Sequence, residues 1–187
     1  MWWKAFLAAL GLIFVAELGD KTQLAILALA SRYAWRTVFW AAASAFALLN
    51  ALAVSVGAAM YRLLPEVVVR YAAAAVFLGF GLWTLVFSRD DGEKGVGEAE
   101  ASRPFLSVFL LVCLMELGDK TQLSLLALTA RYANPLFVFL GGTLALWGTT
   151  LLGALAGKGL GRVIPPRFLR WVAGTAFLLF GILALFW

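Results

Sequence analysis

The chain has 187 residues, of which 64% are hydrophobic and only 13% are charged. Soluble domains carry about 25% charged residues, so this composition excludes an ordinary soluble protein. The net charge of +5 does not indicate a nucleic-acid partner, because the basic residues flank apolar segments, as is normal at membrane ends, and form no patch.

Six apolar segments follow one another along the chain. In order they cover residues 5–31, 37–61, 71–88, 104–130, 132–157 and 171–187. A bilayer core needs roughly 17–25 apolar residues for each helix that crosses it. The sequence therefore predicts an all-α integral membrane protein with six transmembrane helices and very little protein outside the lipid bilayer.

The chain contains an internal repeat. The string ELGDKTQL occupies residues 17–24 and returns letter for letter at 116–123, and RYA at 32–34 returns at 131–133. Between the two halves lies a charged, glycine-containing stretch that is typical of a solvated linker. We predict a first three-helix repeat at 1–88, a linker at 89–103 and a second repeat at 104–187.

Three helices in each half is an odd number, and this determines the geometry. The second half must then enter the membrane from the opposite side, so the two repeats are inverted, as in many secondary transporters with midplane sites. Outside the motifs, nine Lys and Arg flank the side that holds the linker and four flank the other. By the positive-inside rule, we expect a cytoplasmic linker and both termini outside.

The repeated motif lies deep in the membrane. Twelve uncharged residues precede Glu17 and ten follow Lys21, and the second copy has the same counts. At about 1.5 Å per residue, twelve residues cover roughly 18 Å, which is near the middle of a ~30 Å core. A charged residue costs about 2.5–3.5 kcal/mol there and is functional by default. We expect the motif charges to face one another or water.

The spacing of the acids predicts a cation site. In a continuous helix, three oxygen-bearing groups per half line one stripe at i, i+3 spacing. These are Glu17, Asp20 and Gln23 in the first half, and Glu116, Asp119 and Gln122 in the second. Meeting across inverted halves, they form a cage of four carboxylates with two amide oxygens. Oxygen ligands suit hard cations such as Ca²⁺, Mg²⁺ and Mn²⁺, whereas a chain with no histidine and one cysteine offers little for zinc.

Lys21 and Lys120 leave two roles open. With both protonated, the cage has a net charge of −2, which matches one divalent ion. Lys21 lies four residues after Glu17 and would neutralise that acid when the ion leaves. Alternatively, a desolvated lysine loses its proton and takes part in coupling.

Other polar residues give weaker signals. Asn50 and either Thr149 or Thr150 occupy matching positions of the two halves and would complete the coordination, although ordinary interhelical hydrogen bonds explain them equally well. Thr22 and Thr121 lie about 140° around an unbroken helix from the glutamates, so we expect no direct ligand role for them. For Gly19 and Gly118 we favour close helix packing over local unwinding.

The doubled motif resembles that of a known family. Two three-helix halves that each carry E-x-G-D-[KR]-[ST] are similar to the cation/proton antiporters of Golgi and chloroplast, which carry manganese or calcium, and to bacterial manganese exporters. Both copies are intact, as Glu17-Gly19-Asp20-Lys21-Thr22 and Glu116-Gly118-Asp119-Lys120-Thr121. The resemblance implies that the acids bind the cation and that protons drive exchange.

We therefore expect a transporter in a bacterial inner membrane that exports Mn²⁺, or Ca²⁺, from the cytoplasm and holds no permanent cofactor. The sequence contains no Ser/His, Cys/His or HExxH arrangement, so we expect no enzyme. Two alternatives remain. The acids and lysines are buried salt bridges that lock the helices together, or the protein exports a small organic cation or amino acid on the same architecture. The oligomeric state is not predicted.

Overall fold

A computed structural model of the chain describes residues 2–63, 65–86 and 103–156, and beyond them 171, 175, 178, 179, 181–183 and 185. The continuous described stretches form seven helices. They are α1 (Trp2–Glu17), α2 (Lys21–Arg32), α3 (Trp35–Leu63), α4 (Glu66–Val86), α5 (Pro104–Glu116), α6 (Lys120–Tyr132) and α7 (Pro135–Ala156). The predicted linker at 89–103, apart from Arg103, and most of the predicted helix at 171–187 lie outside the described residues.

Two of the described helices, α3 and α7, are each long and apolar enough to cross a membrane. The pair α1 and α2 adds a third such span if it is counted as one, bent by 68°. The helices expected at 37–61 and 132–157 thus agree with α3 and α7 to within a few residues. Helix α4 begins at Glu66, five residues earlier than the helix expected at 71–88.

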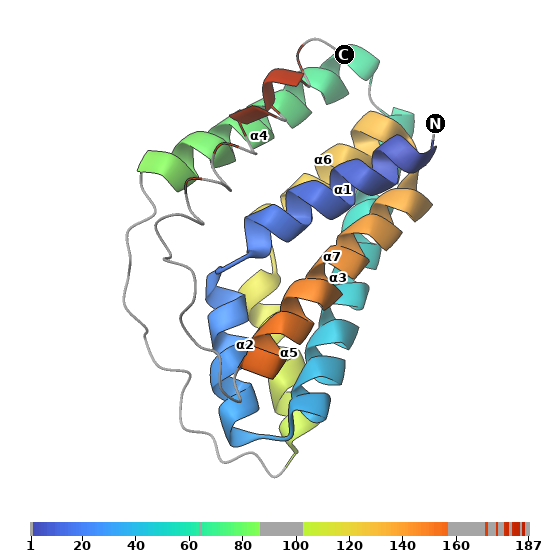
Figure 1. The fold of residues 1–187 in the computed structure, drawn as a ribbon. Helices are drawn as coiled ribbons and strands as arrows, with labels where there is room; N and C mark the ends of the chain where they lie inside the picture. Colours follow the sequence, from blue (N-terminus) through green and yellow to red (C-terminus); the bar gives the residue numbers. More distant parts are fainter. Residues whose placement is uncertain are drawn as a thin grey trace.

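The helices pack in a reciprocal pattern between the first half (α1 to α4) and the second half (α5 to α7). Helices α3 and α7 pack against each other, α1 and α2 pack on α7, and α5 and α6 pack on α3. Figure 1 shows that α1 and α2 run in the opposite direction to α5 and α6, and that α3 runs opposite to α7. Each half therefore places its motif-bearing helices against the long helix of the other half.

Small residues allow these helices to approach closely. A Cβ built on Gly57 of α3 would lie 2.6 Å from the carbonyl oxygen of Leu126 in α6, and one on Gly141 of α7 would clash with the carbonyl of Phe6 in α1. Helix association in a membrane depends on such packing, because lipid is as apolar as a leucine side chain.

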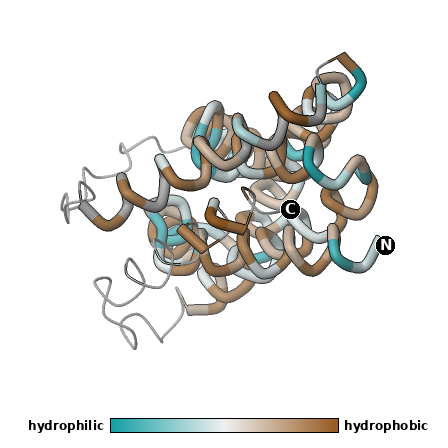
Figure 2. The backbone as a smooth tube through the Cα atoms, turned by 90° about the horizontal axis from the view of Figure 1, so that it is seen from above, coloured by the Kyte–Doolittle hydropathy of each residue, from teal (hydrophilic) through white to brown (hydrophobic). Residues whose placement is uncertain are grey.

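The outer surface is apolar. Large side chains on three helices are about half exposed, for example Leu7 at 52%, Leu52 at 55% and Leu144 at 48%. Hydrophobic residues cover most of the tube in Figure 2. An exposed apolar surface of this extent is foreign to soluble monomers and suits a protein surrounded by lipid.

Both motif helices are broken at the same point, whereas the sequence favoured continuous helices. Helices α1 and α5 end at the motif glutamate, and α2 and α6 begin at the motif lysine. Gly19 and Gly118 take φ values of +77° and +76°, a left-handed conformation that costs other residues about 1–2 kcal/mol. The expectation of continuous helices over 5–31 and 104–130 is therefore wrong at the motif. The preferred packing role is also wrong for Gly118, because a Cβ there would meet nothing within 4 Å.

Candidate cation site

At each helix break, the motif glutamine of the same half accepts a hydrogen bond from the backbone N–H of the motif glycine. The Gly19 N–H donates a 2.5 Å hydrogen bond to Gln23 Oε1, and the Gly118 N–H donates one of 3.0 Å to Gln122 Oε1. Gln23 Nε2 in turn donates to the carbonyl oxygen of Thr149 at 3.2 Å. The two amide oxygens expected to bind a cation thus accept hydrogen bonds from the breaks, although each keeps a second lone pair.

The aspartates begin the helices that follow the breaks. Asp20 is the N-cap of α2 and Asp119 the N-cap of α6, both with extended backbone and neither with its side chain bonded to the first turn of its helix. An N-cap aspartate usually accepts such a backbone hydrogen bond. These carboxylates are therefore available for contacts outside their own helices.

Asp20 contacts the other half. Its Oδ1 forms an ion pair with Lys120 Nζ at 2.8 Å. Its Oδ2 is buried and has no hydrogen-bond partner among the described residues. A buried carboxylate oxygen without a partner is costly, so this atom is a natural place for a cation to bind.

The motif glutamates are the most buried of the described acids, with Glu17 2% exposed and Glu116 1% exposed. Each accepts a hydrogen bond from a threonine of the opposite half. Thr22 Oγ1 donates to Glu116 Oε1 at 2.5 Å, and Thr121 Oγ1 donates to Glu17 Oε1. In an unbroken helix, Thr22 and Thr121 would point away from the glutamate of their own half, and nothing in the sequence indicated that each contacts the glutamate of the opposite half. The Gly-Asp order, typical of a helix end followed by a new N-cap, is the signal that could have revealed the break.

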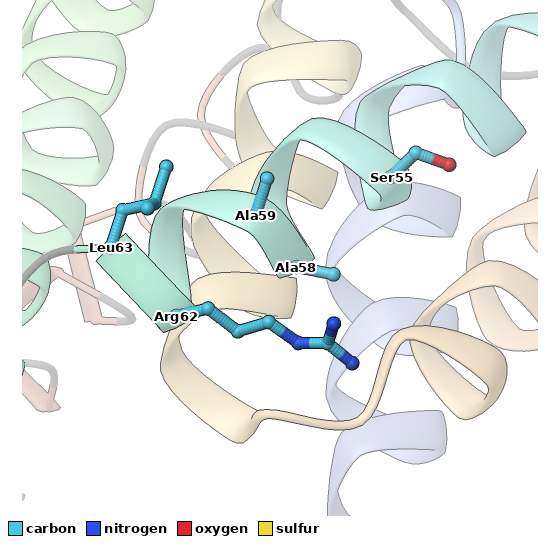
Figure 3. A pocket seen from close by; sticks show the side chains of 5 residues that line it. All are labelled: Ser55, Ala58, Ala59, Arg62 and Leu63. Carbon is cyan, nitrogen blue, oxygen red and sulfur yellow. The ribbon is translucent and has the colours of Figure 1, made fainter.

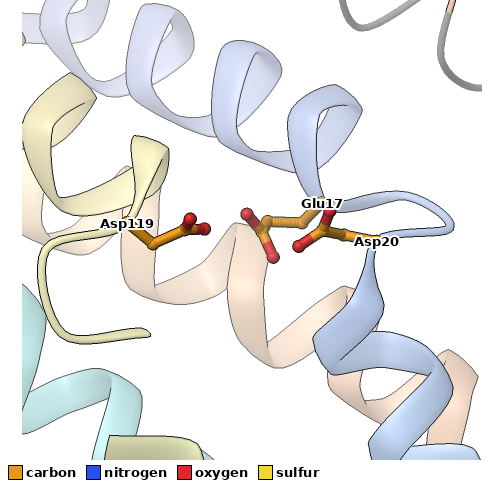
Figure 4. A group of neighbouring side chains, drawn as sticks. All are labelled: Glu17, Asp20 and Asp119. Carbon is orange, nitrogen blue, oxygen red and sulfur yellow. The ribbon is translucent and has the colours of Figure 1, made fainter. Parts of the chain in front are cut away.

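Three acids from both halves meet at the breaks. One carboxylate oxygen from each of Glu17, Asp20 and Asp119 lies within 4.8 Å of the other two. Figure 4 shows Asp119 directed across the gap toward Glu17 and Asp20. Hard cations take oxygen ligands at about 2.0–2.6 Å, so oxygens up to roughly 5 Å apart can surround one ion. Glu116 is not in this group.

The other residues predicted to take part in the site do not belong to this group of three acids. The Lys21 side chain lies outside what the structure describes. Asn50 Nδ2 donates to Thr143 Oγ1 at 3.1 Å, and Thr149 Oγ1 donates to the carbonyl of Leu146 at 3.1 Å. Thr150 Oγ1 is buried and unbonded among the described residues. No hydrogen bond in the described part of the chain joins these three side chains to an acid.

A hollow of about 380 Å³ lies elsewhere, beside the last turns of α3. Figure 3 shows its lining residues, Ser55, Ala58, Ala59, Arg62 and Leu63. It contains no acid, and the Ser55 hydroxyl is already bonded to the carbonyl of Ala51 at 2.7 Å. This hollow offers no set of cation ligands.

Comparison with known proteins adds to this geometry. The chain matches the family model described as "Divalent cation/proton antiporter GDT1" over residues 5–92 and 104–187, which are its two halves. GDT1-like protein 5 of Arabidopsis thaliana is 31% identical over 218 residues, covering 97% of this chain and 95% of the relative.

Two further relatives come from a bacterium and a plant. The "Putative manganese exporter" of Vibrio cholerae serotype O1 is 33% identical over 176 residues, covering 93% of this chain and 86% of the relative. Protein PAM71, chloroplastic, of Arabidopsis thaliana is 29% identical over 205 residues, which cover 95% of this chain and 55% of the relative. No solved structure matches the chain.

Proposed function

The chain belongs to the divalent cation/proton antiporter family, and on that premise we propose that it exports Mn²⁺, or Ca²⁺, from the cytoplasm in exchange for protons. Family membership confirms the resemblance that the doubled motif indicated. It also makes the protein an integral membrane transporter and not an enzyme. The observation that carries the proposal is the group of three carboxylates, drawn from both halves, at the two helix breaks.

Manganese is the first choice of cargo. Carboxylate oxygens suit Mn²⁺ and Ca²⁺ alike, and the bacterial relative bears the name of a manganese exporter. We assign Glu17, Asp20 and Asp119 as cation ligands, with Glu116 joining them through its second carboxylate oxygen while Thr22 holds the first. Rotation of the two motif glutamines would add their amide oxygens.

Proton coupling follows from the charges. Moving one charge across 100 mV is worth about 2.3 kcal/mol, so exporting a divalent ion from a negative cytoplasm costs roughly twice that and needs a driving ion. When the metal leaves, carboxylates crowded in a low-dielectric site repel one another. Protons can then replace the metal and return across the membrane.

The architecture proposed for this activity is two inverted three-helix repeats with six transmembrane helices, at 1–88 and 104–187. The reciprocal packing of the halves and the opposite directions of their motif helices support it. A cytoplasmic linker at 89–103 and external termini, in a bacterial inner membrane, complete the proposal.

The test measures Mn²⁺ flux into proteoliposomes while the pH gradient is varied. We expect saturable flux that reverses with the gradient. Glu17→Gln, Asp20→Asn, Glu116→Gln and Asp119→Asn should each reduce it to the level of protein-free liposomes, whereas Asp91→Asn in the predicted linker should not change it.

Retained exchange in all four variants would contradict the acidic site. If the wild-type protein binds none of Mn²⁺, Ca²⁺ and Mg²⁺, the alternative of an organic cation or amino acid exporter gains support. If the four acids serve only as structural salt bridges, their variants should lose stability while the wild-type protein shows no metal flux.

A further inference from the structure

The ion pair between Lys120 and Asp20 joins the two halves at the candidate site. Lys120 is the first residue of α6, and Asp20 is the N-cap of α2. Their side chains are only 17% and 20% exposed. The sequence suggested that Lys21 neutralises Glu17 of its own half, and the Lys21 side chain lies outside what the structure describes. The contact of Lys120 crosses from one half to the other.

The ammonium group is paired with a carboxylate that the cation needs. Asp20 belongs to the group of three acids that can surround an ion, and Lys120 Nζ is bound to Asp20 Oδ1. An ammonium group has three donors and no acceptor, so it cannot itself be a ligand. A divalent ion among these carboxylates would also repel the positive charge beside it. The metal and the ammonium group therefore compete for Asp20.

Building on the proposed function, we infer that Lys120 is a tethered cation that occupies Asp20 when the site is empty and is displaced when a divalent ion binds. Its charge is fixed, and its role is positional. An empty carrier then does not expose an uncompensated cluster of acids. The cost of displacing the ammonium group weakens metal binding, and its return speeds metal release.

The experiment removes the charge and measures Mn²⁺ binding to the purified full-length protein by equilibrium dialysis at one pH. Lys120→Gln and Lys120→Met should each bind Mn²⁺ at least about tenfold more tightly than wild type, the scale of one charge interaction at a partly buried site. Lys120→Arg keeps the charge and should bind like wild type. Arg131→Gln, which removes one charge from the same helix about 16 Å away, is the matched control and should also bind like wild type.

Flux in proteoliposomes gives a second readout. In Lys120→Gln we expect KM and turnover to fall together, because metal is held more tightly and leaves more slowly. Lys120→Arg should keep exchange, since arginine supplies the charge but does not release a proton. Loss of exchange in Lys120→Arg with normal binding would show that the lysine proton is needed, which overturns a fixed charge.

Three other results bear on the inference. Unchanged or weaker Mn²⁺ binding in both neutral variants, with normal wild-type exchange, would overturn it and leave the proposed function intact. Aggregation of both neutral variants at every Mn²⁺ concentration would overturn it too, because metal then cannot replace the ammonium charge. Recovery of folded neutral variants only in the presence of Mn²⁺ would support it. Wild-type protein that binds no Mn²⁺ would contradict the proposed function first.

Discussion

Two threonine hydroxyls hold the most buried acids of the site in place. Thr22 and Thr121 are 0% and 1% exposed, and each donates to the glutamate of the opposite half. A hydrogen bond to an ionised carboxylate is roughly twice as strong as one between neutral groups. These hydroxyls therefore orient Glu116 and Glu17 without needing to be cation ligands.

Replacing either hydroxyl by a methyl group should impair exchange. We expect Thr22→Val and Thr121→Val each to lower Mn²⁺/proton exchange at least about tenfold, because a lost hydrogen bond to a charged group is worth roughly 1.5–3 kcal/mol. Thr22→Ser and Thr121→Ser should recover most of it. Initial rates of flux in proteoliposomes provide the measurement.

The control for these variants lies on the same helix as Thr121. Thr129 Oγ1 is buried without a hydrogen-bond partner among the described residues, so Thr129→Val should leave exchange unchanged and should not lower the melting temperature. Equal losses in the valine and serine variants would contradict a role for the hydroxyl.

The sequence predicted some of the residues that meet at the candidate site, but not their hydrogen-bond partners. That Glu17, Asp20 and Asp119 lie close together could be predicted, because charges at membrane depth are too costly to be incidental. Their partners could not, because Thr22 reaches Glu116 only across the two halves. No spacing along one chain segment encodes that contact.

At the level of elements, the breaks determine what the motif can do. Ending α1 at Glu17 and starting α2 at Lys21, with a 68° bend, turns Asp20 into an N-cap and changes the direction in which Thr22 points. Length and hydropathy predicted α3 and α7 well, because an uncharged run long enough to span the bilayer permits few other structures. Length and hydropathy could not reveal the two helix breaks, since a left-handed glycine changes neither the length nor the hydropathy of an apolar segment.

A substitution at the second break tests its backbone conformation. Because a Cβ on Gly118 would meet no atom within 4 Å, Gly118→Ala isolates the cost of a positive φ. We expect a loss of about 1–2 kcal/mol of stability and a lower melting temperature in detergent, followed by circular dichroism.

Gly11 supplies the comparison, since its Cβ would also meet nothing within 4 Å, but it lies inside α1. Gly11→Ala should raise stability by about 0.5–1 kcal/mol, the usual gain of alanine over glycine in a helix. A Gly118→Ala protein that melts at or above the wild-type temperature would mean that the break does not require this conformation.

For the molecule as a whole, the proposed inversion predicts the sides on which its ends lie. A reporter fused after Trp187 should read outside and one inserted at Gly95 should read cytoplasmic, because nine basic residues flank the linker side against four on the other. Protease protection in spheroplasts would check both. Both reporters on the same side would contradict an odd number of helices in the second half, and a cytoplasmic Trp187 reporter would overturn the orientation.

The crossed hydrogen bonds give this duplicated sequence an unusual dependence. Duplication commonly supplies a spare copy that can lose its original chemistry while the other keeps it. Here the hydroxyl of each copy serves the carboxylate of the other, and Asp20 of one pairs with Lys120 of the other. Neither ELGDKTQL string is a backup for its twin, so damage to one disables the contribution of both.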